Sequence, residues 1–317
     1  MKKFVSTLAA FVMLLSCLMA PAALADDKIS VVTTIFPIYD WVRQVAGDNL
    51  SNIDLTMLLD NGVDLHSYQP TAQDIMKVSN ADLFIYVGGE SDEWVEDVLE
   101  AAPNADIRAI NLVEAMGEDI KMEEMVEGME HAEEEDEEEA DEHVWLSLHN
   151  AEKLVKVIAD VLAEIDGEHA DTYLNNAKEY EKKLSALDER YKETISSAAF
   201  DTLLFADRFP FRYLTDDYDL KYYAAFSGCS AESEASFDTV AFLIGKLNEL
   251  ALPAVIRLED GRINIADTII RDSATKDQRI VILHSMQQIT GEDVRTGISY
   301  LSVMEDNQNA LREALNP

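Results

Sequence analysis

The chain has 317 residues, with 62 Asp and Glu against 25 Lys and Arg, and a formal net charge of −37. This length favours two domains over a single core. The acidity excludes general nucleic-acid binding, which needs clustered Lys and Arg to neutralise phosphates. A negative field concentrates cations near the surface with little selectivity, so charge alone does not separate a metal-binding protein from an acidic soluble one.

The first 25 residues have the pattern of an export signal. Lys2 and Lys3 precede an uncharged, mostly apolar run at 4–15, and Ala-Leu-Ala at 23–25 offers a small-x-small cleavage site. The apolar run is too short to span a bilayer as a permanent anchor. Residues 14–17 resemble a bacterial lipobox ending in Cys17. We therefore expect an extracytoplasmic protein, either released after cleavage or anchored by a lipid at Cys17.

Short apolar runs rich in β-forming residues alternate with helical patterns downstream of the signal. We expect four strands in a first lobe and four in a second, at 29–35, 53–59, 82–87 and 107–110, and at 202–206, 220–225, 254–258 and 280–283. Strands separated by helix-length segments indicate parallel sheets. The predicted fold class is α/β, with two lobes that each contain a mostly parallel four-stranded sheet flanked by helices. The first lobe should cover 26–166 and the second 200–317.

The segment between the lobes, 167–199, predicts one long helix. Apolar residues recur at steps of three and four from Leu174 to Ile195, and neither Pro nor Gly occurs from 168 to 200. A helix of about 30 residues is about 45 Å long. It would run past both lobes as a stiff connector.

The segment 117–142 is dense in Glu and Asp and contains His131. Like charges at this density repel one another and find no core to join, which predicts a disordered loop. It is either a solvated insertion or a weak, fast collector of metal ions, because carboxylates bind cations readily but discriminate poorly among transition metals.

Three histidines occupy positions suited to metal binding. His66 lies in a turn-rich loop after a predicted strand, His143 follows the acidic segment, and His284 comes directly after the last predicted strand. Ligands of open α/β sheets bind beyond the carboxyl ends of strands, so a cleft between the lobes could bring these side chains together. Neutral imidazole favours Zn²⁺, Cu²⁺ or Ni²⁺, and tetrahedral Zn²⁺ accepts imidazole and carboxylate together.

Cysteine usage narrows the possible sites further. Only Cys229 remains if the signal is removed after residue 25, which excludes an intrachain disulfide and a zinc site built from paired thiolates. Cys229 could be a soft metal ligand, but a small buried thiol is the more common role for such a residue.

Four stretches, in this order along the chain, resemble the zinc- and manganese-specific solute-binding proteins of bacterial ABC importers. They are VVTTIFPI at 31–38, GVDLHSYQP at 62–70, HVWL at 143–146 and GISYLSVM at 297–304. The resemblance covers nearly the whole mature chain. It implies two α/β lobes joined by a long helix, with one metal ion in the cleft between them. It also implies a monomer that delivers Zn²⁺, or alternatively Mn²⁺, to the membrane permease of an ABC importer.

The resemblance also implies ligands. His66 and His143 match the first two ligand positions of the family, and His284 falls where the family places a carboxylate after the last strand. The third position is occupied by Arg208, whose guanidinium stays protonated and cannot bind a metal. Its neighbour Asp207 is the leading substitute.

Other candidates for that position remain open, namely Glu232, Glu234, the more remote Glu259, and water. The predicted metal ligands are therefore His66, His143, His284 and Asp207. Three imidazoles with a carboxylate or water favour Zn²⁺ over Mn²⁺.

Two other functions compete with metal delivery. Three protein ligands plus water also describe catalytic zinc, but the sequence has neither a His-Glu-x-x-His helix nor a nucleophile elbow, so we expect no enzyme. An adhesin or scaffold is the third possibility.

Overall fold

The computed structural model describes residues 28–130, 139–229, 235–259 and 265–317. Several predicted features lie outside these ranges, namely the signal peptide at 1–25 with Cys17, His131, Glu232 and Glu234. Their roles stay predictions.

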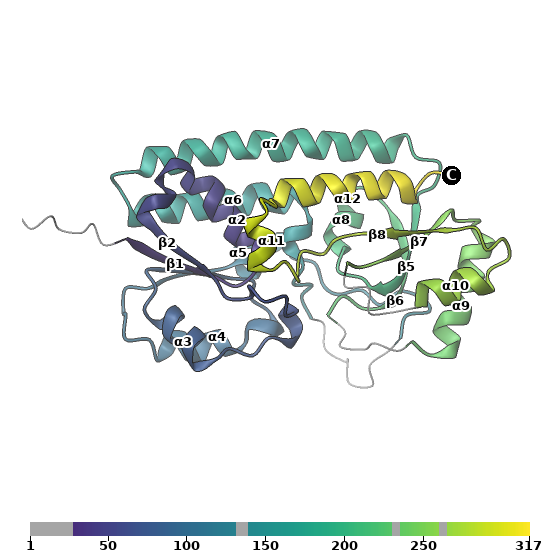
Figure 1. The fold of residues 1–317 in the computed structure, drawn as a ribbon, viewed down its shortest axis with the longest axis horizontal. Helices are drawn as coiled ribbons and strands as arrows, with labels where there is room; N and C mark the ends of the chain where they lie inside the picture. The colour runs from purple at the N-terminus through teal and green to yellow at the C-terminus, as the bar shows by residue number, and fades with distance from the viewer. Residues whose placement is uncertain (1–27, 131–138, 230–234, 260–264) are drawn as a thin grey trace, which may run out of the picture.

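Two parallel four-stranded sheets form the framework of the molecule (Figure 1). The first has the order β2-β1-β3-β4, with β1 at Ile29–Thr33, β2 at Ile53–Met57, β3 at Leu83–Tyr86 and β4 at Arg108–Asn111. The second has the order β6-β5-β7-β8, with β5 at Thr202–Arg208, β6 at Lys221–Phe226, β7 at Ala254–Arg257 and β8 at Arg279–Ile282. Each predicted strand is present, with ends that differ by one or two residues. The predicted fold class is confirmed.

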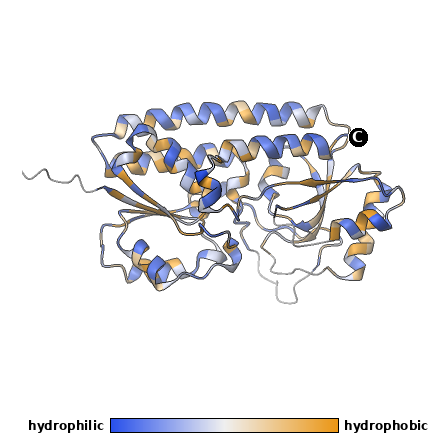
Figure 2. Cartoon of the chain, in the orientation of Figure 1, coloured by the Kyte–Doolittle hydropathy of each residue, from blue (hydrophilic) through white to orange (hydrophobic). Residues whose placement is uncertain are grey.

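Helices cover both sheets because each sheet has hydrophobic residues that must be buried. The helices of the first lobe are α2 at Phe36–Ala46, α3 at Ala72–Ser79, α4 at Trp94–Glu100, α5 at Leu112–Met116 and α6 at Leu148–Ile165. Those of the second are α8 at Arg212–Asp217, α9 at Phe237–Glu249, α10 at Ile265–Asp272, α11 at Gly291–Arg295 and α12 at Tyr300–Ala314. In Figure 1, α2 and α6 lie above the first sheet and α3 and α4 below it. Figure 2 shows the strands as mainly hydrophobic and the helices as mixed.

The long helix α7, Ala170–Ser196, runs along the top of both lobes (Figure 1). Its 27 residues give a length of about 40 Å. A buried face that includes Tyr180, Leu184 and Tyr191 packs against α2, α6 and α12. The helix lies within the predicted connector 167–199, whereas the lobe boundaries at 166 and 200 stay a prediction.

Buried hydrogen bonds join the two lobes beside His143. The Trp145 indole N–H donates to the carbonyl oxygen of Ser285 at 2.8 Å, and the Tyr300 hydroxyl donates to the carbonyl oxygen of Trp145 at 2.7 Å. The Tyr300 backbone N–H donates to Asp40 Oδ2 at 2.9 Å. These contacts connect residues far apart in the sequence and hold the segment that follows His143 between the lobes.

The described parts of the acidic segment, 117–130 and 139–142, are ordered against the second lobe, so the prediction of a disordered loop is wrong for them. Glu130 N–H donates to the carbonyl oxygen of Ala225 at 2.9 Å, and its Oε2 accepts from the Thr239 hydroxyl at 2.7 Å. Met122 and Ala140 form an antiparallel bridge. The prediction failed because composition does not reveal that carboxylates have specific donors on another lobe.

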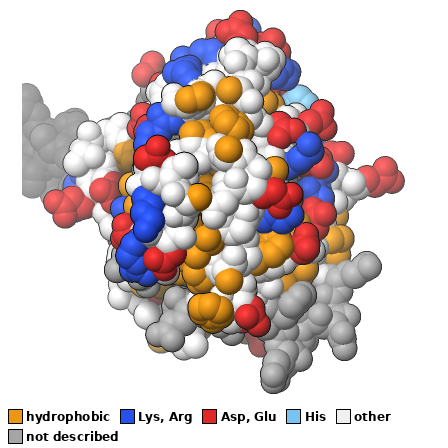
Figure 3. Space-filling model, turned by 90° about the vertical axis from the view of Figure 1, so that its right-hand side faces the viewer, with side chains coloured by type: hydrophobic (Ala, Val, Ile, Leu, Met, Phe, Trp, Pro, Cys, Tyr) orange, Lys and Arg blue, Asp and Glu red, His pale blue; other side chains and the backbone are white. Residues whose placement is uncertain are grey.

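Figure 3 faces the end of the molecule formed by the second lobe. Hydrophobic side chains gather over the middle and lower part of this face, bordered by charged side chains of both signs. The exposed large hydrophobic residues of this lobe include Phe237, Ile280 and Ile282. None of the helices in the described ranges has the length and hydropathy needed to cross a bilayer.

Candidate metal centre

His66 is positioned by a short 3-10 helix, η2, at Leu65–Ser67. Asp64 caps this helix, because its side chain accepts the His66 backbone N–H at 3.1 Å. The turn before it needs Gly62, which has a φ of +77° and would place any Cβ 3.3 Å from Thr290. The His66 ring nitrogen Nδ1 lies 2.8 Å from the Ser91 hydroxyl. This contact fixes the ring and leaves Nε2 pointing away from Ser91.

His143 is fully buried and is fixed by one carboxylate. Asp141 Oδ1 accepts the His143 backbone N–H at 2.8 Å and the ring Nδ1–H at 3.0 Å. A carboxylate on Nδ1 sets the tautomer and makes Nε2 a more basic metal ligand. Nε2 of His143 faces Nε2 of His66 at 3.2 Å.

The two rings have opposite electrostatic surroundings. Burial, reinforced by the positive charges of His143 and Arg208, lowers the pKa of His66 to about 3. Burial also disfavours the charged form of His143, but Asp141 outweighs it and raises the pKa of His143 overall. His66 is therefore neutral near pH 7, while His143 retains its proton more strongly.

A third donor approaches this pair from the second lobe. The Cys229 sulfur and one ring nitrogen each of His66 and His143 all lie within 4.8 Å of one another. Gly228 lies so close to His143 that an added Cβ would stand 3.0 Å from the ring and 2.9 Å from the carbonyl oxygen of Phe209. Among the described residues, this is the group of three His, Cys, Asp or Glu side chains that could hold one metal ion.

Arg208 is tied to the first lobe beside the pair. Its guanidinium donates to Asp64 Oδ2 at 2.8 Å, and this pairing holds the pKa of Asp64 below its ordinary value despite burial. With its amide oriented to satisfy its neighbours, Gln287 donates to both Asp64 oxygens at 3.2 Å, and its oxygen lies 3.1 Å from His143 Nε2. Gln287 therefore presents a neutral oxygen to the same nitrogen that faces His66.

The structure brings His66 and His143 together but does not add Asp207 or His284 to their group. Asp207 is buried, and its two oxygens accept the backbone N–H groups of Arg208 at 2.9 Å and Leu258 at 3.0 Å. His284 Nδ1 accepts the Met286 N–H at 3.0 Å and lies 3.2 Å from Glu259.

Two residues near the pair were not among the predicted ligands. The sequence favours a buried thiol for Cys229 over a soft metal ligand. Gln287 follows His284 by three positions in the same loop. Only the course of that loop shows which of its side chains turns toward His143.

A buried carboxylate adds negative charge behind His66. Glu142 Oε1 accepts the Ser91 N–H at 2.9 Å, and Oε2 lies 3.7 Å from His66 Nδ1. Oε2 has no hydrogen-bond partner among the described residues. Burial raises the pKa of Glu142. A cation bound between the two rings would favour the ionised form of this group.

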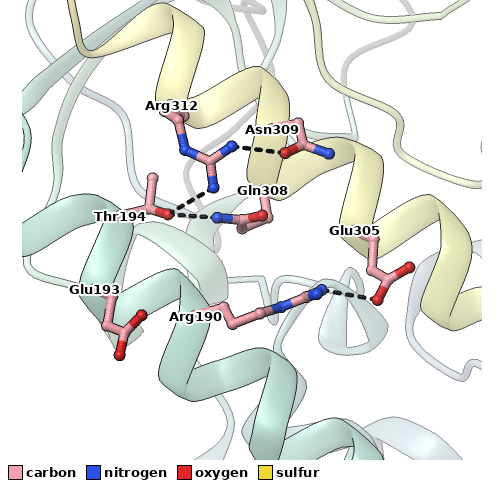
Figure 4. A pocket seen from close by; sticks show the side chains of 7 residues that line it. All are labelled: Arg190, Glu193, Thr194, Glu305, Gln308, Asn309 and Arg312. Carbon is pink, nitrogen blue, oxygen red and sulfur yellow. Dashed lines mark hydrogen bonds and ion pairs between the residues drawn. The ribbon is translucent and has the colours of Figure 1, made fainter.

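A separate hollow of about 300 Å³ lies between α7 and α12 (Figure 4). Both arginines that line it have partners: Arg190 pairs with Glu305 at 2.8 Å, and Arg312 donates to Asn309 at 2.8 Å and lies 3.5 Å from Thr194. It shares no residue with the group around His66. Its neutral balance of charge does not favour a metal ion.

Comparisons with known proteins identify the family of this chain. The sequence model of a family described as zinc-uptake complex component A, periplasmic (ZnuA), matches residues 31–314. The chain belongs to this family. This is a family of zinc-uptake components, which confirms the family expected from the sequence.

Individual relatives extend the comparison. The zinc-binding lipoprotein AdcA of Streptococcus pneumoniae is 33% identical over 292 residues, covering 91% of this chain and 56% of that protein. The chain thus spans little more than half of that relative. The high-affinity zinc uptake system protein ZnuA of Bacillus subtilis is 28% identical, and the match covers 91% of this chain and 88% of that protein. The crystal structure of the Zn(II)-bound ZnuA-like domain of AdcA from Streptococcus pneumoniae matches with a TM-score of 0.71 and 29% identity. The match covers 92% of this chain and 100% of that domain.

Proposed function

We propose that this ZnuA-family chain is the extracytoplasmic zinc-binding component of an ABC importer. It captures one Zn²⁺ between its lobes at His66 and His143 and delivers the ion to the membrane permease. The zinc-binding AdcA and zinc-uptake ZnuA relatives support the cargo. The family description as periplasmic and the name of AdcA as a lipoprotein support a location outside the cytoplasm, consistent with the export signal.

The observation that carries the proposal is the spacing of the two ring nitrogens. Zn–N bonds of about 2.0–2.1 Å at tetrahedral angles place two nitrogens roughly 3.3 Å apart. His66 Nε2 and His143 Nε2 are 3.2 Å apart. Each ring is fixed through Nδ1, by Ser91 or by Asp141, so that Nε2 is available to a metal. This distance supports a zinc ion between the two rings.

The donors favour Zn²⁺ over Mn²⁺. Mn²⁺ prefers carboxylate, carbonyl and water oxygens, whereas imidazole and thiolate suit Zn²⁺. The group at this site offers two imidazoles and a thiol, and Asp207, the carboxylate predicted as a ligand, accepts backbone N–H groups instead. Of the predicted set, His66 and His143 remain in our proposal. His284 and Asp207 do not.

Titration calorimetry of the metal-free mature chain with Zn²⁺ and Mn²⁺ tests this proposal. We expect one tight Zn²⁺ site per chain, loss of tight binding in His66→Ala and His143→Ala, and parental binding in His284→Ala. Circular dichroism controls for folding. If both His66→Ala and His143→Ala bind Zn²⁺ like the parent, the site is wrongly assigned. If His284→Ala loses tight binding together with His66→Ala and His143→Ala, the three-histidine set expected from the sequence is right.

A further inference from the structure

We propose that Cys229 is a direct thiolate ligand of the bound ion and makes this site selective for thiophilic metals. The inference rests on the proposed function, because it concerns the same site. It goes further in assigning the anionic ligand to a sulfur atom from the second lobe. The cargo class is then ions that bind thiolate well, such as Zn²⁺ and Co²⁺, to the exclusion of Mn²⁺.

Distances support a sulfur ligand. Zn–S and Zn–N bonds of about 2.3 and 2.0–2.1 Å at tetrahedral angles place a sulfur roughly 3.5 Å from each nitrogen. The Cys229 sulfur lies within 4.8 Å of one ring nitrogen of each histidine. A movement on the order of 1 Å therefore brings it into the coordination sphere, which is within the reach of a side-chain rotation and a small shift of its loop.

The loop that carries Cys229 is held against the site from two sides. The Cys229 backbone N–H donates to Glu123 Oε1, in the acidic segment, at 3.0 Å. On the other side, Gly228 packs against the His143 ring, where a larger residue would meet backbone. The acidic segment thus positions the sulfur.

Three nearby carboxylates have other partners. Asp64 pairs with Arg208 and Asp141 holds His143 Nδ1, while Asp207 accepts two backbone N–H groups. Gln287 offers only a neutral oxygen. Among the side chains of the three-membered group, Cys229 alone can become an anion, and thiolate is a soft ligand that selects zinc over manganese.

Binding must displace the thiol proton. Burial, followed by the negative charges of Glu123, Glu142 and Asp141, raises the pKa of Cys229 well above its ordinary value. The metal-free protein therefore holds a thiol. On binding, the S–H bond breaks, the proton leaves to solvent, and the sulfur electron pair passes to the metal, whose charge replaces that of the proton.

Cobalt provides a direct test on the intact protein. The metal-free mature chain is titrated with Co²⁺ and its absorption recorded, because thiolate ligation gives an intense sulfur-to-cobalt charge-transfer band that imidazole and oxygen ligands lack. Zn²⁺ and Mn²⁺ affinities are then measured for the parent, Cys229→Ser and His284→Ala. We expect the band in the parent and in His284→Ala but not in Cys229→Ser. Cys229→Ser should lose more than roughly tenfold in Zn²⁺ affinity, since even partners of ligands are worth 10–100-fold.

The outcomes separate the two proposals. Tight Zn²⁺ binding that requires His66 and His143, with no charge-transfer band and parental affinity in Cys229→Ser, overturns the thiolate ligand and leaves the zinc function intact. Zn²⁺ binding that does not require the two histidines means that the proposed site itself is wrongly assigned. A parent that binds Mn²⁺ as tightly as Zn²⁺ also refutes the selectivity. The parent spectrum is read on the unaltered chain, so misfolding of a variant cannot obscure the result.

Discussion

Asp141 offers a sharp test of how the buried histidine is prepared for a metal. Its Oδ1 accepts both the backbone N–H and the ring Nδ1–H of His143, at 2.8 and 3.0 Å. In Asp141→Asn the amide oxygen can still accept these hydrogen bonds, but the negative charge is gone. In Asp141→Ala both contacts are lost and the ring is free to turn or to change tautomer.

The two substitutions should therefore differ in magnitude. Removing a partner that orients a metal-bound histidine typically costs 10–100-fold in metal affinity. We expect Asp141→Asn to lose about tenfold in zinc affinity, or about 1.4 kcal/mol of binding free energy, because the position of the His143 ring is kept and only the basicity of its Nε2 falls. Asp141→Ala should lose about 100-fold or more in zinc affinity, or about 2.8 kcal/mol of binding free energy.

The chain contains a matched control. Asp166 makes the same kind of contact, with its Oδ2 2.8 Å from His169 Nδ1, but outside the candidate site. Zinc affinity is measured by competition with a chelator of known strength for Asp141→Asn, Asp141→Ala and Asp166→Asn. Parental affinity in both Asp141 variants would refute the role of this carboxylate. Equal losses in Asp141→Asn and Asp166→Asn would show a global effect instead.

Three further predictions concern groups around the site. Arg208→His should lower the free energy of unfolding of the metal-free protein by about 3 kcal/mol, measured by denaturant unfolding, because buried Asp64 loses its partner. The same substitution adds an imidazole beside the site and should therefore raise zinc affinity, measured by zinc titration. Burial raises the pKa of Asp92 from 3.8 to about 7, so its neutral form stabilises the fold below about pH 4, and this contribution is lost as pH rises toward 7. Asp92→Asn should therefore flatten the pH dependence of unfolding between pH 4 and 7, by about 4 kcal/mol at most. Glu123→Ala should lower zinc affinity about tenfold, measured by chelator competition, because Cys229 loses its backbone anchor, whereas unchanged affinity would separate the acidic segment from the site.

The sequence by itself determined the framework and singled out two of the three side chains of the candidate group. Hydrophobic runs of strand length, separated by helical patterns, located all the strands to within one or two residues. The uninterrupted helical period before residue 200 located α7. These signals are local, because the period of hydrophobic residues can be read from residues that are close together in the sequence. His66 and His143 were found because each lies in a short contiguous motif.

Tertiary structure decided the rest of the site. Cys229 and Gln287, which approach the histidine pair, lie on loops of the second lobe, and a loop has no period that tells which side chain points inward. His284 and Gln287 share one such loop, yet only Gln287 contacts His143. Asp207 follows a strand as expected, but its oxygens accept backbone N–H groups that exist only in the folded sheet. The order in the acidic segment likewise depends on donors from the other lobe, because such long-range hydrogen bonds leave no trace in local composition.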